Sequence, residues 1–378
     1  MRIAPFGVEQ WMNEWETGAV TNLAETCVDS MTLGELLDID GSRDSLGSAA
    51  NLRLSYGDIK GSDELLALIA SLYENQSSEN VIVMNGGIAA NFISMFTLVE
   101  PGDEVICMYP TYQQLYSIPE SFGADVNLLR LRHEDGFLPD LDRLESMVTK
   151  RTKLICVNNP NNPTGSLLRE PELRRIADIA GSVGAWVHCD EAYRFMVHAP
   201  DEQVPSMVSL YDRAVVSCSL SKCFSLAGLR IGWLVGPRHF IDEVFSRRDY
   251  TTISCGMLDD LFARAAVRNS KKIFARNLAI VRSCAAMLDE WVDGEPKVDY
   301  ARPSAGTTAF LRYGCEIGSE DFCRRLFKKD GTFLLPGRCF GNEFDRYLRI
   351  GYAYSPDVLN VGLRKLSDFL RDLEREGL

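Results

Sequence analysis

Short apolar runs alternate with longer mixed stretches along the chain from about residue 80 onward. The apolar runs are rich in β-branched residues and predict strands at 81–84, 104–108, 153–158, 185–190, 214–219 and 233–236. Between them, stretches that Gly or Pro opens or closes predict helices at 88–98, 171–181 and 238–247. This alternation is typical of a parallel sheet with crossover helices, so the pattern predicts an α/β fold.

The pattern changes after a long helical stretch at about 258–292. Further strands are expected at 307–313, 332–335 and 347–352, with helices between and after them. Ser355 and Pro356 suit the cap and first turn of the last helix. Its apolar stripe consists of Leu359, Leu363, Leu366, Leu370 and Leu373. We therefore expect a separate small α+β unit whose last helix packs on a core.

Composition mainly excludes classes of partner. The chain has 378 residues, 46% of them hydrophobic and 25% charged, as in a globular protein with one large and one smaller core. A net charge of -13 with dispersed Lys and Arg predicts neither a nucleic-acid nor a membrane partner. No apolar segment of signal-peptide length begins the chain, so we expect a cytoplasmic protein. The 11 Cys lack a Cys-x-x-Cys pair and the four His are scattered, which predicts reduced thiols and no metal site.

The segment from Ser219 to Lys222 carries the strongest chemical signal. It reads Ser-Leu-Ser-Lys at a predicted strand end, and Arg230 follows eight residues later within Gly-Leu-Arg-Ile-Gly. A Lys in this setting can form an imine, while small hydroxyl groups and a nearby cation hold a phosphate. A lone Lys after a strand is more often a solvated side chain, so the interpretation depends on the accompanying motifs.

Polar groups also end two neighbouring strands. The strand at 185–190 closes with Asp-Glu-Ala-Tyr, where Asp190 is placed to pair with a protonated ring nitrogen of a ligand. Asn162 lies in the turn Asn-Asn-Pro-Asn-Asn-Pro-Thr-Gly. Its amide and the Tyr193 hydroxyl can donate to a ring oxygen and so lower the pKa of an imine. A helix N-cap at Asp190 and a plain Asn-Pro turn are the structural alternatives.

Two further turns suit a flat, phosphorylated ligand. Gly86, Gly87 and Ile88 lie between a strand and a helix, where bare backbone N–H groups can bind phosphate. Tyr112 follows the strand at 104–108 and can stack on a heterocycle, with a core or surface Tyr as the alternative.

One arginine lies inside an apolar strand of the small unit. Arg349 occurs in Tyr-Leu-Arg-Ile-Gly, where a buried guanidinium is costly unless it meets a carboxylate. Its planar fork binds a carboxylate through two hydrogen bonds. We expect Arg349 to hold a substrate carboxylate, with a structural ion pair as the alternative.

Together these motifs resemble the class I/II aminotransferases, which are fold-type I enzymes that use pyridoxal 5'-phosphate (PLP). The matching series is Gly86-Gly87, Tyr112, Asn162-Pro163-Thr164-Gly165, Asp190-x-x-Tyr193, Ser219-x-x-Lys222, Arg230 and Arg349. The resemblance implies a large PLP-binding domain with a mainly parallel seven-stranded sheet at 46–275. It also implies a small α+β domain from 1–45 and 276–378, with Trp11 and Trp15 at the substrate mouth.

The resemblance implies a role for each matching residue. Lys222 would form the Schiff base and move the α-proton, Asp190 would pair with the pyridine nitrogen, and Arg349 would bind the substrate α-carboxylate. Tyr56 matches a position that reaches the phosphate of a neighbouring subunit, which implies a homodimer with shared sites. The other implied contacts are ring hydroxyl and substrate for Asn162, ring hydroxyl for Tyr193, ring stacking for Tyr112, and phosphate for Gly86, Gly87, Ile88, Ser219 and Arg230.

The implied reaction is transamination between an α-amino acid and a 2-oxo acid, through a Lys222 Schiff base and a quinonoid intermediate. Two segments depart from the common pattern: 304–310 reads Ser-Ala-Gly-Thr-Thr-Ala-Phe, and 27–36 is more like the branch that contains capreomycidine synthase. An elimination or cyclisation of a hydroxylated arginine-like amino acid is therefore the alternative. A non-catalytic PLP-binding module is the minor alternative.

Overall fold

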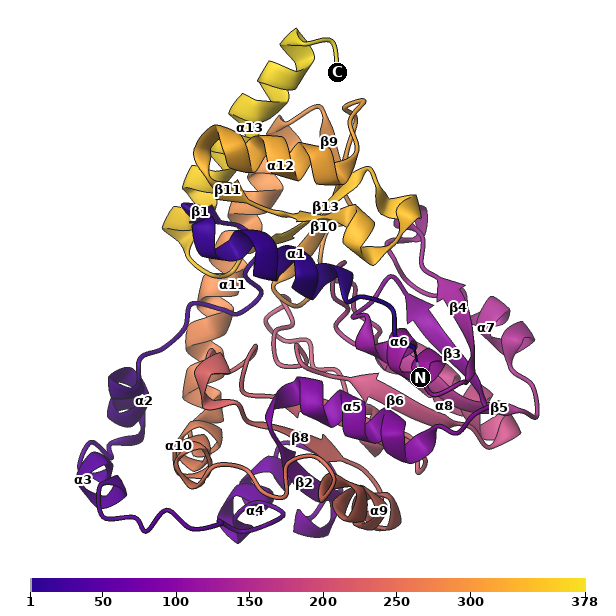
Figure 1. Cartoon of the computed structure of the whole chain (residues 1–378), viewed down its shortest axis with the longest axis vertical. Coiled ribbons are helices and arrows are strands. Elements are labelled where there is room, and N and C mark those ends of the chain that lie inside the picture. Colours follow the sequence, from indigo (N-terminus) through magenta and orange to yellow (C-terminus); the bar gives the residue numbers. More distant parts are fainter. Residues whose placement is uncertain (1) are drawn as a thin grey trace.

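A seven-stranded sheet forms the centre of the larger lobe of the molecule, whose computed structural model describes residues 2–378 (Figure 1). The strand order is β2-β8-β7-β6-β5-β3-β4, and only β8 runs antiparallel to its neighbours. The predicted mainly parallel sheet is therefore confirmed. Its strands are β2 (Val81–Met84), β3 (Glu104–Tyr109), β4 (Asp125–Arg130), β5 (Thr152–Asn158), β6 (Trp186–Asp190), β7 (Ala214–Ser219) and β8 (Gly232–Val235).

Burial on both faces explains why most of these strands read as unbroken apolar runs. In β2, Ile82 and Met84 join one core cluster, whereas Val81 and Val83 join the other. Strands that helices cover on both sides need apolar residues at every position. The edge strand β4 is only partly buried and carries Asp, Asn and Arg. Its sequence therefore lacks an unbroken apolar run and does not predict a strand.

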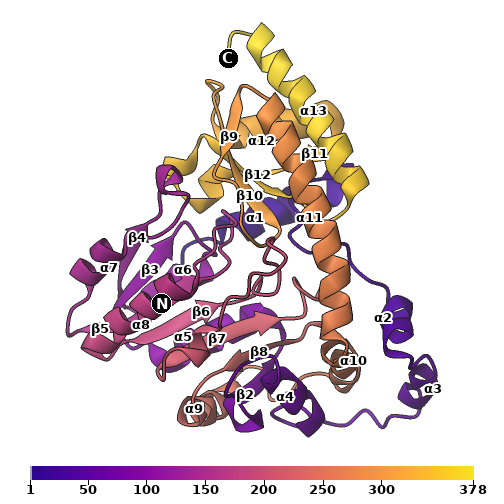
Figure 2. The same ribbon diagram turned by 180° about the vertical axis from the view of Figure 1, so that it is seen from behind.

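Helices pack on the two faces of the sheet (Figures 1 and 2). The apolar faces of α5, α6 and α9 share one core cluster with the sheet, and those of α4, α8 and α10 share the other. The helices of this lobe are α4 (Asp63–Ala70), α5 (Gly86–Leu98), α6 (Gln114–Ser121), α7 (Leu141–Met147), α8 (Glu170–Val183), α9 (Arg238–Arg248) and α10 (Met257–Arg268).

The smaller lobe contains a four-stranded antiparallel sheet of order β12-β13-β10-β9. Its strands are β9 (Val298–Tyr300), β10 (Thr308–Tyr313), β12 (Leu335–Pro336) and β13 (Tyr347–Gly351). The predicted single strand at 332–335 breaks at Leu334, because β11 (Thr332–Phe333) pairs instead with β1 (Thr21–Asn22). The helices of this lobe are α12 (Ser319–Asp330) and α13 (Pro356–Arg375), and Ser355 caps α13 as predicted.

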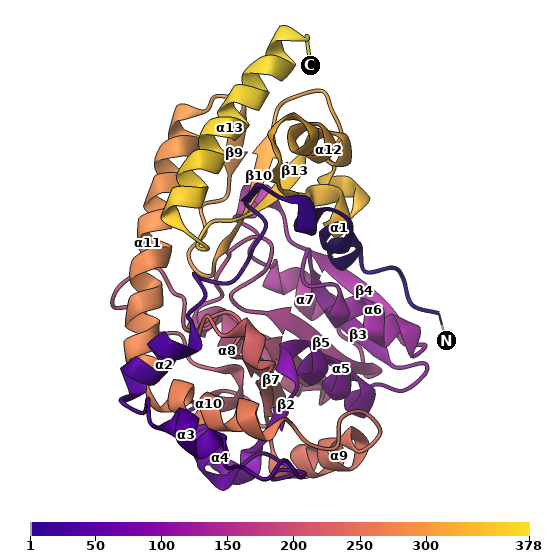
Figure 3. The ribbon, with the colours of Figure 1, turned by 60° about the vertical axis from the view of Figure 1, so that its left-hand side comes forward.

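The N-terminal segment crosses between the lobes. Its first helix, α1 (Gly7–Trp15), lies on the small lobe, and the long α11 (Ser270–Gly294) runs from that lobe toward α10 (Figure 3). After α1, the N-terminal segment continues to α2 (Leu33–Asp40), which packs on α10. It then forms α3 (Ser45–Ala49). No helix in the described part of the chain is both long and apolar enough to cross a membrane.

Candidate active site

A cavity of about 390 Å³ opens where the two lobes and the N-terminal segment meet. Turns after β3, β5, β6 and β7 form one wall, and α1, residues 24–27 and β13 form the other. Every residue predicted for the site lines this cavity except Gly86 and Tyr56. Gly86 directly precedes Gly87, which does line it.

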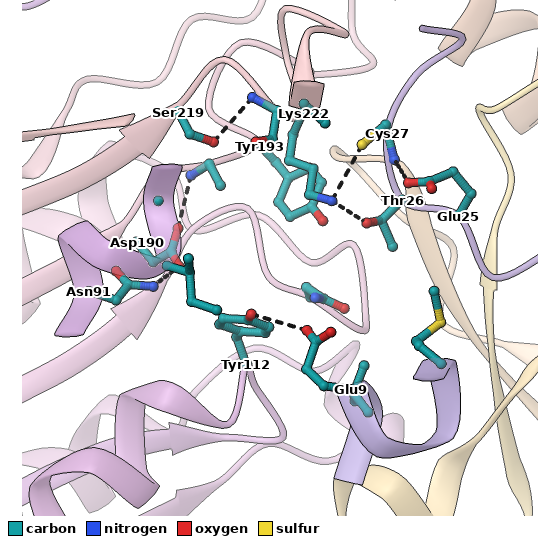
Figure 4. A pocket seen from close by; sticks show the side chains of 18 of the residues that line it. Glu9, Glu25, Thr26, Cys27, Asn91, Tyr112, Asp190, Tyr193, Ser219 and Lys222 are labelled. Atoms are coloured by element: carbon teal, nitrogen blue, oxygen red, sulfur yellow. Dashed lines mark hydrogen bonds between the residues drawn. The ribbon is translucent and has the colours of Figure 1, made fainter. Parts of the chain in front are cut away.

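Lys222 lies in the turn after β7, and its side chain points across the cavity (Figure 4). Its Nζ donates to Thr26 Oγ1 at 2.6 Å and lies 3.6 Å from Cys27 Sγ. Burial lowers the pKa of Lys222, but the Cys27 thiol, the Tyr193 phenol and the Glu25 carboxylate outweigh it, so the pKa is raised. Burial raises the pKa values of Cys27 and Tyr193 themselves, so Glu25 is the anion that balances the ammonium at neutral pH.

Asp190 ends β6 and is 7% exposed. Its Oδ2 accepts from Asn91 Nδ2 at 2.9 Å and its Oδ1 accepts from the Ala192 backbone N–H at 3.1 Å (Figure 4). Burial raises the pKa of Asp190, and these two donors partly offset that rise. The carboxylate is thus held as an acceptor at the edge of the cavity. The residues after Asp190 form a turn and not a helix, so the N-cap alternative is wrong.

Tyr112, Tyr193 and Asn162 also line the cavity. The Tyr112 hydroxyl donates to Glu9 Oε1 at 3.3 Å, and Tyr193 is buried beside Lys222. Asn162 is 6% exposed and is held by its own backbone N–H, which donates to Asn158 Oδ1 at 2.7 Å. These groups add an amide and a phenol to the lining of the cavity.

The start of α5 lines the cavity with groups that could bind an anion. No side chain caps α5, so its first N–H groups remain available, and Ser219 and Arg230 lie next to it. Gly86 has a φ of +82°, and a Cβ there would lie 2.8 Å from Arg230 Nη2. A Cβ on Gly232 would lie 2.4 Å from the Gly86 carbonyl carbon. Glycine is therefore required at both positions for the helix start, β8 and the guanidinium to meet.

Arg349, in the middle of β13, is 3% exposed. Its Nη2 donates to the Ala24 carbonyl at 2.9 Å and its Nη1 donates to Asn162 Oδ1 at 3.4 Å. Its Nε is one of the buried side-chain nitrogens without a partner among the described residues. Burial lowers the pKa of Arg349, and the nearby Tyr193 and Glu25 offset this only in part. The guanidinium is thus suited to an anionic group of a ligand rather than to the structural ion pair considered above.

Three carboxylates from the N-terminal segment face the same cavity, and sequence reasoning missed all of them. They are Glu9, Glu16 and Glu25. Burial raises the pKa of Glu25, but Lys222 and the Cys27 N–H lower it by more. The pKa of Glu16 is raised by burial and then by the like charges of Glu25 and Glu9. Such a cluster favours a positively charged group on a ligand.

One sequence-based placement differs from the structure, and one is not tested by it. The prediction that Trp11 and Trp15 line the substrate mouth is wrong: Trp11 is 6% exposed and donates to the Leu334 carbonyl at 3.0 Å, and Trp15 packs on Trp11 and Phe327. Val8, Glu9 and Met12 of the same helix face the cavity instead. Tyr56 is 75% exposed and away from the cavity, so its predicted contact with a second subunit stays a prediction.

The donor set fits PLP. An amine, a carboxylate, a phenol and an amide line one cavity together with an uncapped helix start and an arginine. The family model of "Aminotransferase class I and II" matches residues 39–366. The chain belongs to this family. Its cofactor is PLP, and it is a PLP-dependent enzyme of fold type I.

Relatives of this aminotransferase-family chain include both transaminases and cyclases. Capreomycidine synthase of Streptomyces vinaceus is 32% identical over 365 residues, which cover 96% of this chain and 93% of that protein. The crystal structure of a PLP-dependent aminotransferase from Streptococcus suis 89-1591 is 40% identical, covers 99% of both chains and has a TM-score of 0.95. The structure of the PLP-dependent cyclase OrfR is 28% identical, covers 98% of both chains and has a TM-score of 0.91.

Proposed function

We propose that this chain transfers the amino group of an α-amino acid to a 2-oxo acid. The observation that supports the proposal most is that Lys222 and Arg349 line the same cavity. Arg349 binds the α-carboxylate through its fork, which places the α-carbon near Lys222 Nζ. A carboxylate there also provides an acceptor for the buried Nε of Arg349.

When bound, PLP supplies an aldehyde that condenses with amines and an electron-poor ring that accepts the electrons of the bond broken at the α-carbon. Lys222 holds the cofactor at rest and, once the substrate amine has replaced it, takes the α-proton on Nζ. Asp190 keeps the ring nitrogen protonated. Tyr193 and Asn162 donate to the ring oxygen, and the α5 N-terminus with Ser219 and Arg230 binds the phosphate.

The N-terminal carboxylates support a substrate whose side chain is a cation. Glu9, Glu16 and Glu25 line the same cavity as Arg349, so the side chain of an amino acid held by Arg349 would lie among them. A guanidinium or ammonium group there offsets the repulsion that raises the pKa of Glu16. Arginine is thus the first amino donor to examine.

The same carboxylates favour a second candidate, cyclisation of a β-hydroxylated arginine-like amino acid. The likeness to capreomycidine synthase and to the cyclase OrfR supports it. In this reaction the α-proton and the β-hydroxyl leave as water. A guanidine nitrogen then bonds to the β-carbon and gives up its proton, and the α-carbon regains one from Lys222. The net change is loss of one water without any keto acid.

Product analysis separates the two reactions. The holoenzyme is incubated with arginine or β-hydroxyarginine, with and without pyruvate or 2-oxoglutarate, and with citrulline as the neutral isostere of arginine. Transamination gives a keto acid in proportion to the oxo acid added, and pyridoxamine phosphate when no acceptor is present. A product 18 mass units lighter than the amino acid, formed without an acceptor, selects cyclisation. If none of these amino acids changes the cofactor spectrum, both candidates fail.

We further propose that the active form is a homodimer in which Tyr56 reaches the phosphate of the partner subunit. Exposed apolar side chains lie beside Tyr56 in the sequence: Leu52 is 36% exposed and Leu54 is 75% exposed. Such a patch suits an interface between subunits. Mixing a Tyr56→Phe variant with a Lys222→Ala variant tests it: a shared site restores activity in the mixed dimer, and independent sites do not.

A further inference from the structure

A chain of buried polar side chains lies behind Asp190, inside the large lobe. Its members, Ser94, His188, Asn91 and Ser217, are each at most 2% exposed. Ser94 Oγ lies 2.9 Å from His188 Nδ1, and His188 Nε2 lies 3.1 Å from Asn91 Oδ1. Ser217 Oγ donates to Asn91 Oδ1 at 2.6 Å, and Asn91 Nδ2 donates to Asp190 Oδ2 at 2.9 Å.

The partners of Asn91 determine which way its amide points. Its oxygen faces a serine hydroxyl and an imidazole nitrogen, and its NH2 faces the Asp190 carboxylate (Figure 4 shows the last contact). Turning the amide over would bring its oxygen within 2.9 Å of Asp190 Oδ2, where two acceptors repel unless Asp190 holds a proton. The amide orientation and the ionisation of Asp190 are therefore coupled.

The same coupling extends to His188. With the amide oxygen toward it, His188 must donate from Nε2 and accept the Ser94 hydroxyl proton at Nδ1. With the amide reversed, Nε2 would accept, and the proton would move to Nδ1. Complete burial lowers the pKa of His188 to about 3, so the ring is neutral and one of these two tautomers is present.

We propose that Asn91 is a positioning residue that, held by His188 and Ser217, keeps Asp190 ionised and aimed at the ring nitrogen of the cofactor. The member of the chain that touches Asp190 is a neutral amide, which donates a hydrogen bond to the carboxylate without giving up its proton. The carboxylate then presents only acceptors to the cavity. This inference rests on the proposed role of Asp190.

The placement of these residues argues against simple packing. Helix α5 is otherwise almost entirely apolar on its buried face, and Asn91 and Ser94 are its two buried side chains with strong hydrogen-bonding groups. Burying an amide, an imidazole and two hydroxyls costs more than burying apolar groups of the same size unless every partner is present. The hydrogen bonds of His188 and Ser217 converge on Asn91, whose amide donates to Asp190.

The first experiment measures the wild-type protein. In protein labelled with 15N-histidine, the ring nitrogen shifts of His188 report its tautomer, and the signal is assigned from its loss in His188→Gln. The proposal predicts the Nε2–H tautomer, unchanged between pH 6 and 8, in both apoprotein and holoenzyme. An Nδ1–H tautomer in the holoenzyme would overturn it.

The second experiment reads the cofactor itself. PLP labelled with 15N in its ring is bound to wild type and to Asn91→Leu, and the ring nitrogen shift reports whether that nitrogen is protonated. We expect a protonated nitrogen in wild type, loss of that protonation in the variant, and a PLP dissociation constant roughly 10-fold higher. Ser217→Ala is expected to show the same changes to a smaller degree, because one donor still holds the amide.

Thr97→Val is the matched control, since Thr97 is a partly buried residue of α5 that bonds only its own helix. It should leave the ring nitrogen shift unchanged. A protonated ring nitrogen in Asn91→Leu would overturn the proposal. Asp190→Ala separates this failure from a failure of the proposed function: if the nitrogen stays protonated even there, Asp190 is not its partner and the role assigned to that residue falls first.

Discussion

The two walls of the cavity differ in how the chain builds them. On the cofactor wall, Asn162, Asp190 and Lys222 follow β5, β6 and β7, which are neighbours in the sheet. On the substrate wall, Glu9 and Arg349 come from the two ends of the chain. The cofactor wall thus depends on adjacent strands of one rigid sheet, whereas the substrate wall depends on how the lobes and the N-terminal segment come together.

This difference indicates which part of the site can change its substrate while the cofactor contacts stay the same. Adjacent parallel strands end at the same edge of the sheet. The sheet therefore fixes the relative positions of the side chains at these ends. The N-terminal segment is held by α1, which packs on the small lobe, and by β1. Changes there can alter the substrate without disturbing the cofactor. Substitutions on each wall should therefore separate cofactor chemistry from substrate choice.

The largest effect is expected on the cofactor wall. Lys222→Ala removes the group that holds PLP covalently and moves the α-proton, so kcat should fall on the order of 10³-fold or more. Borohydride reduction followed by mass spectrometry should find PLP on Lys222 in wild type and not in the variant. Lys328→Ala, at an exposed position of α12, is the control. Retained covalent PLP in Lys222→Ala would contradict the assignment.

Arg349→Gln should impair the substrate wall alone. Losing one partner of a buried ionic contact costs about 2–5 kcal/mol, so kcat/KM should fall at least roughly 30-fold, mainly through KM. The absorption spectrum of bound PLP should not change. Arg312→Gln removes a half-buried arginine paired with Asp299 outside the cavity and should have little effect. An altered cofactor spectrum in Arg349→Gln would show that the two walls are not independent.

The double variant Glu9→Gln/Glu25→Gln should change substrate preference. Removing two negative charges should weaken the binding of a cationic substrate side chain by about 1–2 kcal/mol. The kcat/KM ratio of arginine to citrulline should therefore fall roughly tenfold. Glutamine keeps the acceptors for Tyr112 and the Cys27 N–H. Glu14→Gln, on the exposed face of α1, is the control. An unchanged ratio would mean that these carboxylates do not face the substrate side chain.

The smallest expected effect is on the free energy of unfolding below neutral pH. It comes from His188, which lies behind the cofactor wall. His188 has a pKa of about 3 when folded, against 6.5 in its ordinary state. Between the folded and unfolded pKa values of His188, the unfolded chain therefore binds one more proton than the folded chain. The stability present above pH 6.5 is lost as the pH falls, by roughly 1.4 kcal/mol per pH unit. His188→Gln lacks this proton, so its free energy of unfolding should fall less steeply.

Denaturant unfolding at pH 5 and pH 7, at one protein concentration, measures this difference, which should be about 2 kcal/mol. Asp190 and Glu191, whose pKa values burial raises, contribute a slope of the opposite sign in both proteins. His239→Gln, on the surface of α9, should retain the wild-type slope. Parallel slopes for wild type and His188→Gln would mean that His188 is protonated in the folded state.

The sequence by itself determined the sheet and the cofactor wall, because both depend on local order. An apolar run followed by a polar turn reads as a buried strand with a functional end, and Asp190, Ser219 and Lys222 each occupy that position. The fold-type I class and PLP follow from those motifs together. Arg349 was found for the same reason, since a charge inside an apolar strand is conspicuous.

Only the tertiary structure decided the substrate wall and the support behind Asp190. Glu9 and Glu25 look like ordinary surface acids, and nothing in α1 shows that Glu9 rather than Trp11 faces the cavity. Asn91 gave a faint signal as a polar residue in an apolar helix. Its partners, however, come from β6 and β7, roughly 100 or more positions away. Contacts over such distances arise when the lobes and helices pack, so no local pattern encodes them.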